Sequence, residues 1–425
     1  MSRIKVSPAV ISGSASPPPS KSAAHRALIC AALAGCGTVR GVIPSDDMLA
    51  TLNGIKALGA AADISGDTAV IKKNEDPPQK PVIDCLESGS TLRLLIPVFA
   101  ALGIEATFTG RGRLPQRPLG VYTDCLPKHG VSLSSENGLP LSIKGRLRAG
   151  KYLLPGDVSS QFITGLLFAL PLCGGDSEIV LTTPLESAPY VDLTIEILQT
   201  AGIKILQTPG GFYIPGGQEY KKTDFQVEGD WSQAAFLLAM GALGGEIRLT
   251  GVRADSRQGD REIVNILRAL DADIKPLNGG FACRRSRLFG ATINAAQIPD
   301  LVPVVAVLCS VASGVSAITG ASRLRLKESD RLAAVARCLN LLGGKAEQTG
   351  DGLIIHGVGR LKGGVSVPSF GDHRIVMSMA AAALACENPI IIEDYQSVAK
   401  SWPGFFEIYK ACGGAADVIQ HREDC

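Results

Sequence analysis

The chain has 425 residues, of which 46% are hydrophobic and 19% are charged, and its formal net charge is +2. A chain of this length exceeds what one hydrophobic core usually supports, so we expect two domains. The near-neutral charge, the lack of a Lys/Arg tract and an aromatic content of 5% argue against a nucleic-acid-binding protein.

Apolar runs in the sequence, such as residues 301–312 and 380–385, are too short to cross a bilayer. Residues 1–6 contain no apolar signal-peptide core, which predicts a cytoplasmic protein without a membrane partner. The eleven cysteines occur singly, many of them inside apolar segments, which is typical of buried thiols in a reducing compartment. Neither they nor the five histidines show metal-ligand spacing, so we predict no metal site.

The chain begins with an alternating segment over residues 3–12, which predicts one strand, followed by a Pro-rich turn over residues 13–20. Ser20 is a good N-cap ahead of a small-residue helix that continues through residues 27–34. Lys21 and Arg26 therefore lie at a helix start. Cations there oppose the helix dipole, but together with the unpaired backbone N–H groups they favour an anionic ligand.

This arrangement recurs at intervals of roughly 70 residues, which indicates an internal repeat. Polar segments precede six buried helices, expected near residues 27–34, 94–102, 162–172, 234–243, 301–312 and 375–385. An amphipathic helix follows each of them, expected over residues 46–58, 119–129, 191–201, 260–270, 330–342 and 402–412. Short alternating strands come after most of these, including residues 62–64, 131–133, 203–206, 272–274 and 345–348. The pattern predicts six β/α units in two domains of three, with a break near residues 228–230.

The densest charge cluster is Arg323–Leu332. Ser329 is a good N-cap for the helix that follows, and Arg331 then lies in the first turn. A solvated charged turn is the commoner meaning of such a run, but the recurrence of cations at other helix starts favours an anion-binding site. Asp300 and Glu328 are the candidate proton-transfer groups.

Seven motifs, in order along the whole chain, resemble those of the enolpyruvyl transferase family, most closely its members that act on shikimate 3-phosphate. Each motif alone is weak, but the ordered set is specific. The motifs are Pro-Ser-Lys-Ser with Arg26, Ser-Gly-Ser-Thr-Leu-Arg93, Gln-Arg-Pro-Leu119, Val-Ser-Ser-Gln161, Glu-Ser-Ala-Pro-Tyr190, Leu-Lys-Glu-Ser-Asp-Arg331 and Asp-His-Arg374, with Ala-Lys-Ser-Trp-Pro403 behind them.

The resemblance implies an α/β fold, a two-domain inverse α/β barrel of six βαβαββ repeats with three per domain. Residues 19–227 would form one domain, and residues 1–18 with 228–425 the other, with the active site in the cleft between them. The implied enzyme transfers the enolpyruvyl group of phosphoenolpyruvate to the 5-hydroxyl of shikimate 3-phosphate and releases phosphate. It would work as a monomer that closes on its substrates, without a metal or cofactor.

The resemblance also assigns site residues by position. The catalytic residues would be Asp300, Glu328 and Lys21, and which of them moves which proton stays open. Phosphoenolpyruvate would be held by Lys21, Gly89, Arg117, Gln161, Arg331, Arg374 and Lys400. Shikimate 3-phosphate would be held by Lys21, Ser22, Arg26, Ser159, Ser160, Gln161, Ser187, Tyr190, Asp300 and Lys327. The chain departs from the family at Glu87 and Arg323, where many members carry Asn.

Two other interpretations remain at this point. A sister transferase acts on a UDP-amino sugar, but it usually carries a cysteine in the loop that corresponds to residues 114–119, and this chain has none there. A non-catalytic repeat scaffold could bind anions through the same helix starts. For Ser159 alone, the alternative is a plain N-cap. Such a scaffold would not need Asp300 and Glu328 as a pair.

Overall fold

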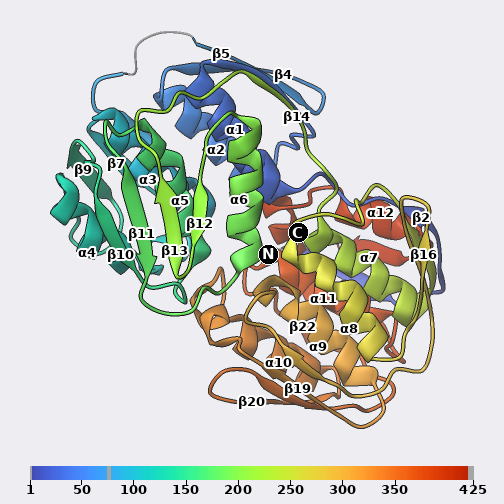
Figure 1. Cartoon of the computed structure of the whole chain (residues 1–425). Helices are drawn as coiled ribbons and strands as arrows, with labels where there is room; N and C mark the ends of the chain where they lie inside the picture. Colours follow the sequence, from blue (N-terminus) through green and yellow to red (C-terminus); the bar gives the residue numbers. More distant parts are fainter. Residues whose placement is uncertain (1, 74–77, 420–425) are drawn as a thin grey trace, which may run out of the picture. The chain divides into compact units, whose positions relative to one another are not determined.

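The computed structural model describes residues 2–73 and 78–419 of the chain. The chain forms two compact units, coloured by sequence in Figure 1. One unit runs from Pro19 to Glu228. The other combines the N-terminal segment that ends at Pro18 with the chain from Gly229 onward.

The unit Pro19–Glu228 contains three four-stranded sheets in its described part, ordered β14-β3-β5-β4, β6-β7-β9-β8 and β10-β11-β13-β12. In each sheet one parallel pair is followed by two antiparallel pairs. The strands are β3 (Cys36–Arg40), β4 (Ala60–Ser65), β5 (Thr68–Lys73), β6 (Val82–Asp84), β7 (Ala106–Thr109), β8 (Val131–Ser134), β9 (Leu141–Gly145), β10 (Lys151–Leu154), β11 (Ser177–Leu181), β12 (Leu206–Thr208), β13 (Gly211–Ile214) and β14 (Thr223–Gln226).

The other unit has three four-stranded sheets with the same pairing pattern, again counted over the described residues. Their orders are β16-β17-β15-β2, β18-β19-β21-β20 and β22-β23-β1-β24. The strands are β1 (Arg3–Ser7), β2 (Ile11–Ala15), β15 (Gly245–Leu249), β16 (Asp273–Leu277), β17 (Gly280–Arg284), β18 (Thr292–Asn294), β19 (Val315–Thr319), β20 (Lys345–Gln348), β21 (Leu353–His356), β22 (Ser366–Val367), β23 (Ile390–Glu393) and β24 (Ala415–Ile419).

The helices alternate between buried and amphipathic along the chain. The buried ones are α1 (Lys21–Ala34), α3 (Gly89–Leu102), α5 (Ser160–Ala169), α7 (Trp231–Gly244), α9 (Val302–Val311) and α11 (His373–Ala383). All residues of α7 are buried, so it is apolar around its whole circumference. Helices α7, α9 and α11 pack against one another, as α3 and α5 do in the other unit (Figure 1).

The amphipathic helices are α2 (Asp46–Ala57), α4 (Gly120–Cys125), α6 (Ala188–Thr200), α8 (Ile263–Ala269), α10 (Arg331–Leu341) and α12 (Phe405–Ala411). On α10 the stripe Leu332, Val335 and Leu339 is buried, and the helix packs on α9 and α11. Short 3₁₀ turns are η1 (Leu114–Gln116), η2 (Leu126–His129), η3 (Leu170–Leu172), η4 (Gly259–Glu262), η5 (Pro299–Leu301), η6 (Ser322–Leu326) and η7 (Tyr395–Lys400).

Five buried helices begin at a side-chain N-cap, which fixes the polar residues that follow. Backbone N–H groups donate to the caps of α1, α3, α5, α7 and α11, which are Ser20, Ser88, Ser159, Asp230 and Asp372. The predicted cap at Ser20 is thus confirmed. The sixth buried helix, α9, follows the turn η5 and has no side-chain cap.

Several predicted elements were wrong in their limits. The strand expected over residues 3–12 is two strands, because Pro8 interrupts it and β1 and β2 pair in different sheets. The helices expected over residues 119–129, 260–270 and 402–412 are shorter, since 3₁₀ turns or loops take one end of each. The strand expected at residues 203–206 begins only at Leu206.

The thiols behave as the sequence predicts. All ten cysteines in the described ranges are free, and nine of them are buried.

No helix within residues 2–73 and 78–419 is long and apolar enough to span a membrane. Within the same ranges, no group of three or more His, Cys, Asp or Glu side chains is placed to hold a metal ion.

Candidate active site

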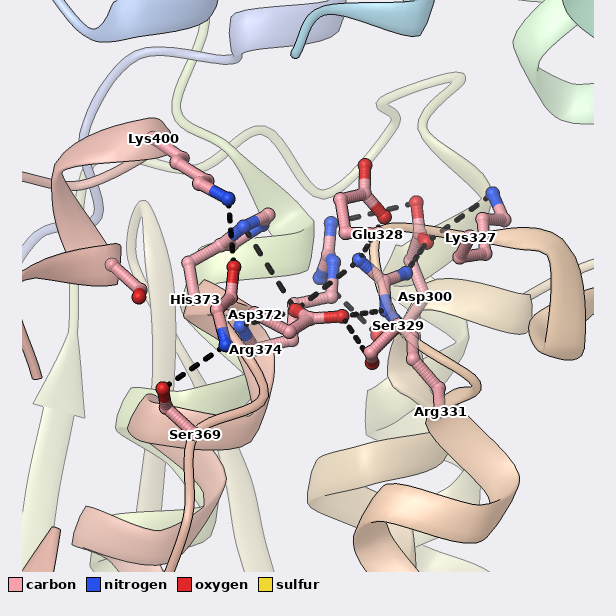
Figure 2. A network of polar contacts seen from close by, with 12 residues as sticks. Asp300, Lys327, Glu328, Ser329, Arg331, Ser369, Asp372, His373, Arg374 and Lys400 are labelled. Carbon is pink, nitrogen blue, oxygen red and sulfur yellow. Dashed lines mark hydrogen bonds and ion pairs between the residues drawn. The ribbon is translucent and has the colours of Figure 1, made fainter. Parts of the chain in front are cut away.

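Arg331, the first residue of α10, lies at the centre of a network of polar contacts. Its guanidinium donates from Nη1 to Asp300 (2.7 Å), from Nη2 to Glu328 (2.7 Å) and from Nε to Asp372 (2.8 Å). Figure 2 shows the arginine between these three carboxylates. Its side chain is 2% exposed, so burial alone would lower its pKa, but the carboxylates outweigh burial and raise the pKa further.

Asp300 lies in the turn η5 at the start of α9 and meets cations from three other segments. Its carboxylate is 2.7 Å from Arg331, 3.4 Å from Arg374 Nη2 and 3.7 Å from Lys327 Nζ. Burial would raise the pKa of Asp300, but Arg374, Lys327 and Arg331 hold it well below its usual value. Asp300 is therefore ionised at neutral pH.

Arg374 and Lys400 are fixed by uncharged acceptors as well. Arg374 Nη1 donates to Ser232 Oγ (2.6 Å) on α7 and to the Asp300 carbonyl (3.2 Å). Lys400, at the end of η7, donates to the Gly371 carbonyl (2.7 Å), in the turn that leads into α11 (Figure 2). Both cations are thereby held at the starts of buried helices.

The structure corrects two features of the sequence interpretation. The N-cap of α10 is Asp330, whose side chain accepts from Ala333 N, and not Ser329. Ser329 instead donates to Asp372 (3.0 Å). The sequence analysis also did not predict that three carboxylates accept hydrogen bonds from Arg331.

Asp372 is a member of this cluster that the sequence analysis did not single out. It is fully buried, accepts from Arg331 and Ser329, and caps α11 through Arg374 N (2.9 Å). The signal was present in the Asp-His-Arg374 motif, but an Asp in that place also looks like an ordinary N-cap.

Asp260 is a second buried carboxyl near this cluster, in the turn η4. Burial and the neighbouring Asp300 raise the pKa of Asp260 to about 6, against a usual value of 3.8. Between about pH 4 and pH 6 the Asp260 carboxyl is therefore protonated in the folded protein but ionised in the unfolded chain. As pH rises through that window, Asp260 lowers the free energy of unfolding.

We expect Asp260→Asn to remove this fall. Urea unfolding at pH 4 and pH 6.5 gives the free energy of unfolding of both proteins. The value for the variant minus the value for wild type should be more positive at pH 6.5 than at pH 4. A difference that is the same at both values would contradict the assignment.

In the unit Pro19–Glu228, the start of α1 carries Lys21 and Arg26. Lys21 Nζ lies 2.5 Å from Asp47 Oδ2 on α2. Arg26 is buried and donates to Thr194 Oγ1 (2.8 Å), to the Ser22 carbonyl (2.8 Å) and to the Tyr190 carbonyl (3.2 Å). Arg26 thus ties α1 to α6, where Tyr190 lies, instead of pairing with a carboxylate.

Gly89 and Arg117 lie against each other. A Cβ built on Gly89 would be 2.7 Å from Nη1 and 2.8 Å from Cζ of Arg117, so the guanidinium packs on the bare backbone at the first residue of α3. This places a cation beside the N–H groups of a helix start, the arrangement that favours a phosphate or carboxylate.

The resemblance to enolpyruvyl transferases assigns Gly89 and Arg117 to phosphoenolpyruvate. On that assignment we expect Gly89→Ala to displace the Arg117 guanidinium and to weaken phosphoenolpyruvate binding about tenfold, the worth of one charge-assisted hydrogen bond. Shikimate 3-phosphate binding and the unfolding midpoint should stay near wild type, because the atom that must move is the end of a flexible side chain. Gly120→Ala is the matched control, since a Cβ there meets nothing within 4 Å. Equal affinities in both variants would contradict the placement.

Gln161, near the start of α5, is held at both ends of its amide. Arg93 Nη1 donates to its Oε1 (2.8 Å), and its Nε2 donates to Ser90 Oγ (3.0 Å). Arg93 also stacks over Phe162, with 5.0 Å between Cζ and the ring centroid. Arg93 therefore orients Gln161, a role that its place at a helix start did not reveal.

The serines predicted to grip phosphate lie at two helix starts. Ser159 caps α5 by accepting from Gln161 N (3.3 Å), which leaves its hydroxyl hydrogen to donate, and Ser160 is the first residue of that helix. Ser187, directly before α6, is buried with a φ of 57°, a left-handed conformation that is uncommon for serine.

The structure also describes the two residues at which the chain departs from the family pattern. Glu87 packs against Gly112, and Arg323 donates to the Ala296 carbonyl (2.7 Å).

A buried chain of hydroxyls, which the sequence did not indicate, links α1 to the start of α3. Thr91 Oγ1 donates to Ser88 Oγ (2.8 Å), so Thr51 must donate to Thr91 (2.7 Å) and His25 Nδ1–H to Thr51 (2.6 Å). Burial, together with Lys21 and Arg26, holds the pKa of His25 well below its usual value, so the imidazole is neutral. These hydrogen bonds hold Ser88, the N-cap directly before Gly89, in place.

We expect Thr51→Val to lower the free energy of unfolding by about 1–3 kcal/mol, because it leaves two buried polar groups without their partner. Thr123→Val is the control, since that hydroxyl is exposed and serves a local carbonyl. Urea unfolding measures both, and equal stabilities would contradict the hydrogen-bonded chain.

Comparisons with known proteins settle the family. The family model described as EPSP synthase (3-phosphoshikimate 1-carboxyvinyltransferase) matches residues 6–409. The chain belongs to the EPSP synthase family. It is 46% identical to the 3-phosphoshikimate 1-carboxyvinyltransferase of Clostridium kluyveri over 421 residues, covering 98% of this chain and 99% of that protein. It is 41% identical to the enzyme of the same name from Clostridioides difficile over 431 residues, again covering 98% and 99%.

A solved EPSP synthase from Acinetobacter baumannii has a similar fold, with a TM-score of 0.83 and 27% identity over 99% of this chain and 100% of that one. The family membership that the seven motifs predicted is thus confirmed, as is the α/β class of the fold. The chain is an enzyme of this family, so neither the UDP-amino sugar transferase nor the non-catalytic scaffold is its function.

Proposed function

We propose that the polar groups described above carry out the reaction of the EPSP synthase family in this chain. That reaction transfers the enolpyruvyl group of phosphoenolpyruvate to the 5-hydroxyl of shikimate 3-phosphate and releases phosphate. The observation that carries the residue assignment is Arg331, which holds Asp300 and Glu328 at 2.7 Å each. One buried guanidinium thereby fixes both proton-transfer groups.

Glu328 is the acid/base for the methylene carbon of phosphoenolpyruvate. That carbon must take a proton while the central carbon becomes cationic, and it must return the proton when phosphate leaves. The Glu328 side chain is 19% exposed, so it can reach a substrate, and the bond from Arg331 Nη2 to its Oε2 fixes its position. Proton transfer by such a positioned carboxyl typically contributes 10²–10⁴-fold.

Asp300 acts at the 5-hydroxyl of shikimate 3-phosphate. Its depressed pKa keeps it ionised, so it can accept a hydrogen bond from that hydroxyl and orient the oxygen for attack. Lys21 is the third candidate for proton transfer, held close to Asp47.

Cations and helix starts bind the anionic groups of both substrates through charge-assisted hydrogen bonds. Phosphoenolpyruvate is held by Lys21, Gly89, Arg117, Gln161, Arg331, Arg374 and Lys400. Shikimate 3-phosphate is held by Lys21, Ser22, Arg26, Ser159, Ser160, Gln161, Ser187, Tyr190, Asp300 and Lys327. Because Arg331 already binds three carboxylates, its contribution to phosphoenolpyruvate is a minor one beside Arg117 and Arg374.

We further propose a two-domain inverse α/β barrel of six βαβαββ repeats, with the active site in a cleft between residues 19–227 and residues 1–18 with 228–425. The six sheets with one pairing pattern support this proposal. Closure of the domains on the ligands, a monomeric state and a cytoplasmic location stay predictions.

Phosphate release from phosphoenolpyruvate tests the function. We expect release that requires shikimate 3-phosphate, with none when a UDP-amino sugar replaces it. Release that is indifferent to the acceptor would contradict the proposed reaction.

A further inference from the structure

A hollow of about 480 Å³ lies where the buried helices α7, α9 and α11 end. Ala242 and Leu243 belong to the last turn of α7, Val311 ends α9, and Leu384 directly follows α11. The residues of the candidate active site occupy the opposite ends of these helices. Helix α7 has 14 residues, so its two ends are about 20 Å apart. The hollow is therefore a separate feature of the same unit.

Three arginines line the hollow, two from the connection between β17 and β18 and one from the segment before β22. Arg285 follows β17, Arg287 precedes β18, and Arg360 precedes β22. No Asp or Glu is part of the described lining. An assembly of three guanidiniums without a carboxylate contrasts with the candidate active site, where carboxylates surround Arg331.

Two of these arginines are held in place by uncharged groups. Arg287 Nε donates to Ser313 Oγ (3.2 Å), and its guanidinium lies over the Phe289 ring at 5.2 Å. Arg360 Nη2 donates to the Cys386 carbonyl (3.4 Å). Each arginine has five N–H donors, so most of them remain for another acceptor.

The rest of the lining is mostly apolar, with Ser286 and Ser313 as its uncharged polar members. Leu243, Leu288 and Leu384 are buried and form part of the wall, and Val10 at the rim is 77% exposed. A volume of this size with partly apolar walls and converging polar groups can hold a small molecule.

The helix ends alone do not account for three arginines. Each helix C-terminus carries about half a negative charge, which favours a cation nearby. Three such ends amount to roughly one and a half negative charges against three positive ones. An excess of positive charge thus remains in a hollow that has apolar walls.

We propose that this hollow binds a small aryl carboxylate. The carboxylate would lie between Arg287 and Arg360, which offer paired N–H donors of the geometry that carboxylates match. The ring would pack on Leu243, Leu288 and Val10. This binding is independent of the proposed reaction.

Fluorine NMR on the full-length protein, with 4-fluorobenzoate as the probe, tests the proposal. Saturating shikimate 3-phosphate is present to occupy the candidate active site. We expect saturable binding with a dissociation constant on the order of 1 mM, as fragments of this size give. Arg287→Ala and Arg360→Ala should each weaken it about tenfold. Arg284→Ala is the matched control. Arg284 is the last residue of β17, directly before Arg285, but it pairs with Glu246 and is not part of the described lining.

Four results would overturn the proposal. They are no saturable binding, equal binding of the neutral 4-fluorobenzamide, unchanged affinity in an Arg287→Ala/Arg360→Ala double variant, and binding that shikimate 3-phosphate abolishes. The last would assign the probe to the active site. The arginines are exposed, so these variants should keep their fold, which the unfolding midpoint checks.

Discussion

Glu328→Gln should lower kcat at least about 10²-fold while substrate binding stays close to wild type. Glutamine keeps the size of the side chain, and its carbonyl oxygen can still accept the hydrogen bond from Arg331 Nη2. Only the proton that must reach the methylene carbon is lost. Steady-state kinetics with both substrates, with their dissociation constants measured separately, give the two quantities.

Glu347→Gln is the matched control for this variant. Glu347 is exposed on β20 of the same unit, so its kinetics should be unchanged. Near-wild-type turnover in Glu328→Gln would remove Glu328 from the mechanism, and a loss confined to KM would make it a binding residue only.

Asp372→Ala should lower the free energy of unfolding by about 3–5 kcal/mol, because it leaves the buried Arg331 without one of its charge partners. The same substitution removes the cap of α11 and the acceptor of Ser329. Burial would raise the pKa of Asp372, but Arg331 holds it below its usual value. Asp372 therefore stabilises the fold above about pH 4, and this contribution is lost as pH falls through its folded pKa.

Urea unfolding at pH 7 measures the effect, and Asp330→Asn serves as the control. Asp330 caps α10 and is half-exposed, and asparagine is an equally good cap, so this variant should be near neutral. A similar stability for Asp372→Ala and Asp330→Asn would show that Arg331 does not depend on Asp372.

The sequence predicted the starts of the buried helices well, because they depend on local patterns. Apolar stretches of helical length, each preceded by a serine or aspartate, indicate where buried helices begin. Ser20 is an example. At Ser329-Asp330 the rule fails, because both residues are good caps and only the tertiary hydrogen bond from Ser329 to Asp372 separates them.

The partners of the site residues could not be predicted, because they come from distant segments. Arg331 meets Asp300 and Asp372, 31 and 41 positions away, and Gln161 meets Arg93 across 68 positions. Charge alone indicated cations at helix starts, but not that carboxylates pair with Lys21, Lys327, Arg331 and Arg374. The contact between Gly89 and Arg117 depends on a missing side chain, which no periodicity reveals.

Deuterium incorporation tests the central claim most directly, namely that Glu328 protonates the methylene carbon and takes a proton back. The reaction is run in D₂O with wild type and with Glu328→Gln at high enzyme concentration, and proton NMR follows the methylene group of the product. Because the intermediate has a methyl group, the wild-type product should carry deuterium at that carbon, and the variant should form deuterated product at least about 10²-fold more slowly. A wild-type product without deuterium, or a variant that forms deuterated product at the wild-type rate, would contradict the account.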